Sequence, residues 1–379
     1  MEKPIYLDYN ATTPIDPEVA EEMLPFIHSS FGNPSSSYFI GRKNKVAVIK
    51  ARQQVAGLIN ANPDEIIFTS GGTESNNHAI RGVAFANRDK GKHIITSSIE
   101  HPAVTEVCKY LNSLGYEITY LSVDTNGKVN PKDVENAIRP DTALITIMHA
   151  NNEVGTIQPI EEIGKIARKH NIAFHTDAAQ SVGKIETDVQ KIGVDLLTIA
   201  GHKLYAPKGI GALYIKSEIK IENLIYGASQ EKGLRPGTEN VPYIVALGKA
   251  CEMANQDFDK NVKNMLSTKE RLLNGLKGKL GDRVKENGTL SITLPNTLSV
   301  AFDKTEAHAL ASLISKEVYI STGSACHADS VEISSVLKAM NIDLMTAAGT
   351  VRISTGKYTT GEEIDFAVEA ITNAVLKLS

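Results

Sequence analysis

Three short, mainly apolar runs decide the fold class: IAFHTDAA (172–179), LLTIAG (196–201) and IGALYI (210–215). Runs of this length with nearly continuous apolar character are typical of strands buried on both faces. Strands of that kind belong to a mainly parallel sheet that helices cover on both sides. The stretch therefore predicts an α/β protein.

The same pattern extends upstream to Glu65. Helical spacing of apolar residues separates the runs, as in IEEIGKIARKH (160–170). This alternation predicts βαβ units and about seven strands, with the ligand site beyond their carboxyl ends. The four further strands are expected at IIFTS (66–70), HIITSS (93–98), EITYLSV (117–123) and ALITIMHA (143–150).

The character of the chain changes after about residue 255. Residues 257–280 have the pattern of a long amphipathic helix. Shorter strands are expected at LSVAF (298–302), VYIST (318–322) and VRIST (351–355), and helices at about 305–316, 331–340 and 361–378. We therefore predict a large domain over 16–255 and a smaller α+β domain that combines 1–15 with 256–379.

Composition narrows the class of protein. The chain has 379 residues, 42% of them hydrophobic, which is enough for two packed cores. A net charge of -4 argues against a nucleic-acid or membrane-surface partner, and no apolar run reaches the roughly 20 residues of a membrane span. The N-terminus lacks a signal-peptide pattern, and Cys108, Cys251 and Cys326 form no CxxC pair, so we expect a reduced, cytoplasmic compartment and no metal site.

Two charged residues end predicted buried strands. Lys203 follows the run 196–201, and Asp177 lies at the end of the run 172–179. A lysine that forms a Schiff base and a carboxylate that pairs with a protonated pyridine nitrogen are the two anchors that pyridoxal phosphate needs. Taken singly, each residue is more often a surface lysine or a helix-capping acid.

Two further strand ends carry polar residues suited to such a cofactor. SGGTES (70–75) follows a strand and opens a predicted helix, where free backbone N–H groups attract a phosphate. A lone GGT is a weak signal, since such residues usually only cap the helix. His101 follows the next strand and could lie over an aromatic ring, although a single strand-end histidine is more often a satisfied polar residue.

Cys326 differs from the other two cysteines. Cys108 and Cys251 lie on helical patterns and are expected in the core. Cys326 lies in STGSACHAD (321–329), a run of small and polar residues that predicts an exposed loop, and His327 beside it would favour the thiolate. Metal binding is the rival use, but the sequence shows no compact Cys/His ligand set.

In this order the motifs resemble the class V aminotransferase-like enzymes of pyridoxal phosphate. Within them the chain is similar to the NifS/IscS cysteine desulfurases and the related selenocysteine lyases. The resemblance spans nearly the whole chain and implies fold-type I, with a seven-stranded large domain and a smaller C-terminal domain. It is carried by LDYNATTP (7–14), GNPSS (32–36), IIFTSGGTESNN (66–77), SSIEH (97–101), NNEVG (151–155), HTDAAQ (175–180), GHKLYAPKGIGALYI (201–215), LRPGTEN (234–240), GSACHAD (323–329) and VRISTGKYTTGEEID (351–365).

The resemblance implies a role for each cofactor residue. Lys203 matches the Schiff-base lysine and Asp177 the partner of the pyridinium nitrogen. Gln180 and Asn152 match residues on the side of the ring's phenolic oxygen, and His101 matches the ring-stacking acid/base.

Residues around the cofactor phosphate follow from the same resemblance. Gly72, Thr73 and His202 match the phosphate site within the chain. Thr238 matches a phosphate ligand that the family supplies from the neighbouring subunit, which implies a homodimer.

The implied reaction converts L-cysteine to L-alanine. Arg352 and Asn33 match the clamp on the substrate carboxylate, and Cys326 matches the cysteine that takes the sulfur as a persulfide for an acceptor protein. Ala200, where many desulfurases have Ser, and His327 lean toward a selenocysteine lyase acting on L-selenocysteine, which stays an alternative. An aminotransferase and a non-catalytic sulfur-transfer scaffold are the weaker alternatives.

Overall fold

The computed structural model describes residues 4–327 and 330–378, and its largest element is a seven-stranded sheet. Its strands are β2 (Ile66–Thr69), β3 (His93–Ser97), β4 (Glu117–Leu121), β5 (Thr142–Thr146), β6 (Ala173–Asp177), β7 (Leu196–Ala200) and β8 (Gly211–Ile215). The order across the sheet is β2-β8-β7-β6-β5-β3-β4. Strands β7 to β4 in that order pair in parallel, and β8 runs antiparallel to both of its neighbours. The mainly parallel sheet predicted from the sequence is confirmed.

Helices cover both faces of this sheet. In β2 the side chains alternate, so that Ile66 and Phe68 pack into one core and Ile67 into the other. The helices of this part of the chain are α1 (Pro17–His28), α2 (Phe39–Leu58), α3 (Gly72–Ala86), α4 (Pro102–Ser113), α5 (Pro131–Ala137), α6 (Ile160–Lys169), α7 (Val189–Ile192) and α8 (Val241–Gln256). Helices α3 and α4 share a core with Ile67, whereas α2, α6 and α8 pack on the opposite face.

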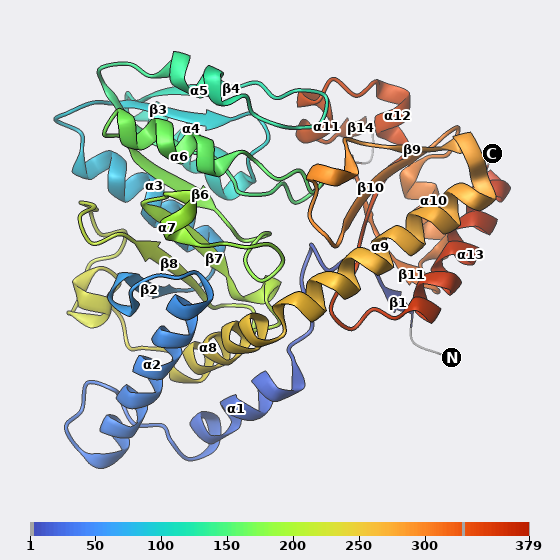
Figure 1. Cartoon of the computed structure of the whole chain (residues 1–379). Coiled ribbons are helices and arrows are strands. Elements are labelled where there is room, and N and C mark those ends of the chain that lie inside the picture. The colour runs from blue at the N-terminus through green and yellow to red at the C-terminus, as the bar shows by residue number, and fades with distance from the viewer. Residues whose placement is uncertain (1–3, 328–329, 379) are drawn as a thin grey trace.

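A second, four-stranded sheet has the order β12-β15-β10-β9. The elements around it are β9 (Val284–Glu286), β10 (Thr297–Phe302), β11 (Val318–Tyr319), β12 (Ser321–Thr322), β15 (Thr350–Ser354), α9 (Phe258–Leu280), α10 (Ala307–Ile314), α12 (Leu344–Ala348) and α13 (Gly361–Leu378). Figure 1 shows α9 running from beside α8 to this second sheet, near which β1 and α13, the first and last described elements, lie. The N-terminal strand β1 (Ile5–Tyr6) pairs in parallel with β11, and Leu7 lies in the second core.

Two expectations for this region were wrong in detail. Residues 330–333 form a strand, β14 (Ser330–Ile333), which pairs with β13 (Ser324–His327), and the helix α11 (Ser335–Ala339) begins later than predicted. The reason is the hydroxyl of Ser334, which accepts the N–H groups of Val336 and Leu337 and so caps a helix that starts at Ser335. The expected strand 318–322 is split, because β11 pairs with β1 while β12 pairs with β15.

The exact division into domains stays a prediction. Helix α8 ends at Gln256 and α9 begins at Phe258, next to the predicted boundary at 255/256. Cys108 and Cys251 are buried in α4 and α8, as expected. No helix of the described ranges 4–327 and 330–378 is long and apolar enough to cross a membrane.

Candidate active site

The candidate site is a cavity of about 480 Å³ at the carboxyl edge of the seven-stranded sheet. Parallel strands end at the same edge, so the segments that follow β2, β3, β5, β6 and β7 converge there. The lining residues are Asn10, Ala11, Gly72, Thr73, Asn76, His101, Ala103, Met148, Ala150, Asn152, Asp177, Ala179, Gln180, Ala200, His202, Lys203 and Arg352. The topology therefore brings together most of the residues that the sequence marked.

Lys203 closes a one-turn 3₁₀ helix, Gly201–Lys203, directly after β7. Its Nζ donates hydrogen bonds to the carbonyl oxygens of Asn10 and, at 2.8 Å, Ala11. Burial and the positive charge of Arg352 lower the pKa of Lys203 to about 8, while Asp177 opposes this shift. The amine therefore loses its proton more readily than an ordinary lysine, which makes the neutral, nucleophilic form accessible near physiological pH.

Asp177 is the last residue of β6 and is buried. Its carboxylate accepts the side-chain N–H of Asn76 at 2.6 Å and the backbone N–H of Ala179 at 2.9 Å. No lysine, arginine or histidine of the described ranges forms an ion pair with it. A buried anion with neutral partners fits a cationic ligand group, such as a protonated pyridine nitrogen.

His101 caps the N-terminus of α4 and is held by its own backbone neighbours. Its Nδ1 accepts the N–H of Ala103 at 3.1 Å, so the neutral ring in this arrangement carries its hydrogen on Nε2. Partial desolvation and the charge of Lys203 lower the pKa of His101, and Asp177 opposes them. His101 lines the cavity, where the Nε2–H of a neutral imidazole can donate a hydrogen bond to a substrate sulfur.

Glu100 lies behind His101 as a buried acid. One carboxylate oxygen accepts the hydroxyl of Ser97 at 2.5 Å, and both accept the N–H of Met148, at 3.0 and 3.2 Å. Burial raises the pKa of Glu100 to about 8 against these hydrogen bonds. Glu100 therefore links the segment after β3 to the segment after β5, which holds the backbone next to His101 in place.

The N-terminus of α3 supplies an anion site at one end of the cavity. Gly71, with φ of 148°, turns the chain into the helix, and no side chain caps the first N–H groups. A Cβ on Gly72 would lie 3.3 Å from the side chain of Ala200, so glycine allows close approach here. Thr73 and His202 line the same cavity, and burial lowers the pKa of His202 to about 4, so its ring is neutral. These groups fit a phosphate.

Arg352, in β15, reaches the cavity from the second sheet. Its Nη2 lies 2.5 Å from Oδ1 of Asp8, and its Nη1 donates to the carbonyl of Asn152 at 3.0 Å. The buried Nε has no partner in the described chain. A planar guanidinium with a donor to spare fits a small carboxylate.

Two predicted site residues do not line this cavity. Asn33 is exposed between α1 and α2, where its side chain accepts the N–H of Ser35. Thr238 is also exposed, in the segment that Arg235 ties to the start of α3 through an ion pair with Glu74. The roles predicted for both residues stay predictions.

Cys326 belongs to strand β13 and pairs with Val331 of β14, whereas the sequence predicted a loop. The backbones of the two strands form a short antiparallel hairpin of four residue pairs. The side chain of Cys326, like that of His327, lies outside what the structure describes.

Sequence reasoning missed two asparagines that organise the site. Asn76 holds Asp177, and its position one turn into α3 was the available signal. Asn10 lies in the quoted motif LDYNATTP, and its carbonyl accepts both Lys203 Nζ and, at 2.9 Å, Gln180 Nε2. Its side chain donates to Thr297 Oγ1 of the second sheet at 2.8 Å. Asn10 therefore joins the two sheets at Lys203.

Known proteins match this arrangement along the whole chain. Residues 5–366 match the family model described as aminotransferase class-V. A relative from Dictyoglomus turgidum named cysteine desulfurase IscS is 49% identical over 379 residues, covering 100% of this chain and 96% of that protein. A solved NifS-like protein superposes with a TM-score of 0.93 at 40% identity, covering 99% of this chain and 100% of that one. A structure described as SspA in complex with cysteine matches with a TM-score of 0.82 at 40% identity, covering 94% of this chain and 100% of that one.

The fold and the site define a fold-type I enzyme that depends on pyridoxal phosphate. The chain belongs to the aminotransferase class-V family. The residues of the cavity fit that cofactor. They include a lysine of lowered pKa, a buried carboxylate without an ion-pair partner among the described residues, and an anion site at a helix N-terminus.

Proposed function

We propose that this protein is a cysteine desulfurase that converts L-cysteine to L-alanine and keeps the sulfur on Cys326 as a persulfide. The observation that carries the proposal is the single cavity that joins Lys203, Asp177, His101 and Arg352. Relatives named cysteine desulfurase IscS and a neighbour solved with cysteine support the choice of substrate.

Each residue would have a distinct task. Bound pyridoxal phosphate supplies an electron sink that acidifies the substrate Cα–H bond and weakens the Cβ–S bond. Lys203 would hold the cofactor and then carry the Cα proton, and Asp177 would keep the ring nitrogen protonated. Arg352 would bind the substrate carboxylate, and His101 would handle the proton of the substrate sulfur.

Sulfur transfer balances as an exchange between two sulfur compounds. The Cβ–S bond of cysteine breaks, an S–S bond to the Cys326 sulfur forms, and Cβ gains a hydrogen, so that cysteine plus thiol gives alanine plus persulfide. A further thiol or an acceptor protein must then take the outer sulfur for turnover to continue. This chemistry fits the cytoplasmic location that we propose, and Cys108 and Cys251 are both free.

The test is exposure of the cofactor-loaded protein to L-cysteine, followed by alanine measurement and mass spectrometry of Cys326. We expect one additional sulfur on Cys326, and loss of alanine formation in Cys326→Ala with cofactor binding kept. Cys108→Ala is the matched control, since burial raises the pKa of that thiol to about 12 and removes it from nucleophilic chemistry. An unmodified Cys326, with activity on L-selenocysteine kept in the alanine variant, would establish the selenocysteine lyase instead.

A homodimer is the second part of the proposal. Thr238 is exposed and outside the cavity of its own chain, as a residue that completes a partner's site would be. Large exposed apolar side chains, Phe31, Phe39 and Tyr226, suit an interface. Sedimentation should show a dimer, and Thr238→Ala should weaken cofactor retention. A fully active monomer would contradict both expectations.

A further inference from the structure

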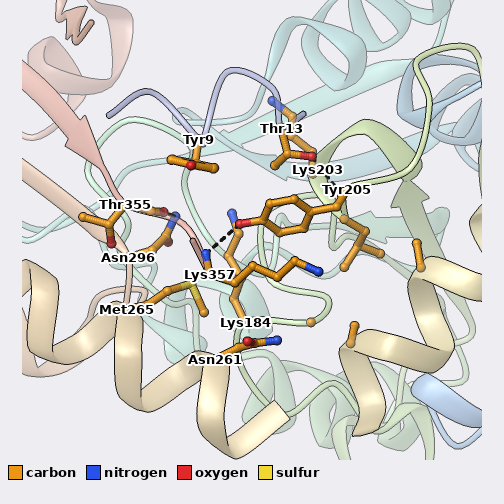
Figure 2. Close-up of a pocket in the computed structure, with 14 residues that line it drawn as sticks. Tyr9, Thr13, Lys184, Lys203, Tyr205, Asn261, Met265, Asn296, Thr355 and Lys357 are labelled. Carbon is orange, nitrogen blue, oxygen red and sulfur yellow. Dashed lines mark hydrogen bonds between the residues drawn. The ribbon is translucent and has the colours of Figure 1, made fainter. Parts of the chain in front are cut away.

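A second lysine, Lys184, is buried behind the candidate active site. It is 7% exposed and lines a small cavity of about 30 Å³ on the far side of Lys203, between the N-terminal segment and α9. Figure 2 shows it among the residues that line this cavity, which include Tyr9, Tyr205 and Met265. No local sequence pattern predicts a lysine at this depth.

The partners of Lys184 are neutral oxygens. Its Nζ lies 3.0 Å from Oε1 of Gln180 and 3.3 Å from Oδ1 of Asn10. In the part of the chain that the structure describes, no carboxylate forms an ion pair with it. The nearby charges are those of Lys203 and Arg352, and burial together with both of them lowers the pKa of Lys184 to about 7. A buried lysine without an acidic partner lowers the stability of the fold, so its presence here needs a further explanation.

Lys184 Nζ donates in both hydrogen bonds, and the ammonium and the neutral amine each have the two N–H donors that these bonds need. Lys184 therefore contacts the oxygen of the Gln180 carboxamide and turns the nitrogen to the other side. That nitrogen donates one hydrogen to the carbonyl of Asn10 at 2.9 Å and keeps a second hydrogen. Gln180 lines the active-site cavity, so the remaining N–H is available to a bound group there.

Asn10 is held in the same sense. Its Oδ1 accepts from Lys184 and also, at 2.9 Å, from Nδ2 of Asn296. Its own amide nitrogen then donates to Thr297 Oγ1 and to the carbonyl of Asn152. With the side chain fixed, the Asn10 carbonyl faces Lys203 Nζ.

We propose that Lys184 is a positioning residue: it fixes the Gln180 carboxamide and Asn10 so that an N–H donor faces the cofactor cavity and a carbonyl faces Lys203. The inference rests on the proposed pyridoxal phosphate chemistry but concerns a residue outside the cavity that binds the cofactor. It predicts that Lys184 acts by orienting the Gln180 carboxamide and Asn10, in addition to any effect of its charge.

The experiment follows the visible absorption band of bound pyridoxal phosphate during a pH titration without substrate. In Lys184→Met, we expect the pH at which half of the absorption change has occurred to move by about 0.5–1 pH unit. This is the size of the effect of one lost hydrogen bond to a charged or polar group. Lys184→Arg keeps the donors and should keep the wild-type midpoint. Lys269→Met is the matched control, because Lys269 of α9 is also buried but donates to Thr293 Oγ1 and the Leu294 carbonyl rather than to Gln180 or Asn10.

A double variant separates orientation from charge. In a Gln180→Leu background, Lys184→Met should add a smaller shift than in the wild-type background, because only its contact with Asn10 is left. A shift of the same size in that background, or no shift in Lys184→Met alone, overturns the proposal. If Lys184→Met fails to fold, Lys184→Gln takes its place, because it removes the amine and keeps a polar side chain. The same results would then support or overturn the proposal. Absence of any visible band in the wild-type protein would instead overturn the proposed function.

Discussion

Lys203 and Lys184 both line the small cavity and approach the same residue, Asn10, but of the two only Lys203 also lines the large cavity. Lys203 donates to the Asn10 carbonyl and opens into a cavity of about 480 Å³, whereas Lys184 donates to the Asn10 side chain beside a cavity of about 30 Å³. Burial lowers the pKa of both, to about 8 and about 7. A lowered pKa therefore does not by itself identify the reactive lysine.

The difference lies in what each amine can reach. The wide cavity brings Lys203 together with a buried carboxylate, a helix N-terminus and a guanidinium group in one space. The narrow cavity has room for water at most and surrounds Lys184 with tyrosines and amides. Reactivity requires space for a ligand as well as a neutral amine, and the topology of the parallel sheet provides that space only at the strand ends.

The largest effect should follow from removing the lysine of the wide cavity. Lys203→Ala should lower alanine formation by at least about 10³-fold, because no other amine can hold the cofactor there. Borohydride treatment of the loaded wild-type protein should fix the cofactor to the peptide that contains Lys203, as mass spectrometry would show. Labelling of Lys184, or of the nearby Lys208, would remove the distinction between the two cavities.

The next effect concerns the carboxylate of the wide cavity. Asp177→Asn should keep the cofactor bound but lower the turnover number by about 10²–10³-fold, since the ring nitrogen loses its charged partner. Steady-state kinetics with L-cysteine and the absorption spectrum of the loaded variant measure the two parts separately. Near-normal turnover would show that the buried charge of Asp177 has no part in the reaction.

Arg352 contributes positive charge to both lysines but can contact a ligand only in the wide cavity. Arg352→Lys keeps the charge and loses the planar pair of donors, so kcat/KM for L-cysteine should fall by about 30- to 1000-fold, or roughly 2–4 kcal/mol. Asp8→Asn is a useful companion, because it removes the ion-pair partner and leaves the guanidinium in place. An unchanged kcat/KM in Arg352→Lys would contradict the assignment.

The smallest effect on turnover should come from Glu100, in the wall of the wide cavity. Its pKa of about 8 in the folded protein lies above the ordinary 4.5, so the folded state binds more protons than the unfolded state between these values. Glu100 therefore makes the free energy of unfolding fall as pH rises from about 4.5 to about 8, by at most about 1.4 kcal/mol per pH unit.

Glu100→Gln should remove this contribution, while its carboxamide oxygen can still accept both the Ser97 hydroxyl and the Met148 N–H. Urea unfolding of the two proteins between about pH 5 and pH 8 tests this, with the variant less sensitive to pH over that window. Equal slopes for both proteins would mean that Glu100 is ionised in the folded state.

The fold could be predicted almost completely from local patterns. Six of the seven strands of the large sheet are buried along nearly all of their length and so must be apolar, whereas β4, at the edge, is partly exposed. The errors fall at residues 318–334, where two-residue strands and a hairpin depend on which distant segment pairs with them. Such short pieces carry no period of their own.

The sequence by itself determined the class of enzyme and the residues at the strand ends. Lys203, Asp177, His101 and Thr73 each follow an apolar run, and the rule for parallel sheets is sufficient to place them together. Their individual chemistry follows from residue type and from position in the motif.

Only the tertiary structure decided how these residues are held. Asn10 joins Lys203, Lys184 and Gln180, and Asp8 pairs with Arg352 across more than three hundred residues of sequence separation. No local pattern marks these contacts, because a hydrogen bond between distant segments depends on where the whole chain brings them. The burial that lowers the pKa of both lysines has the same origin, since it comes from packing of the N-terminal segment and α9 against the sheet.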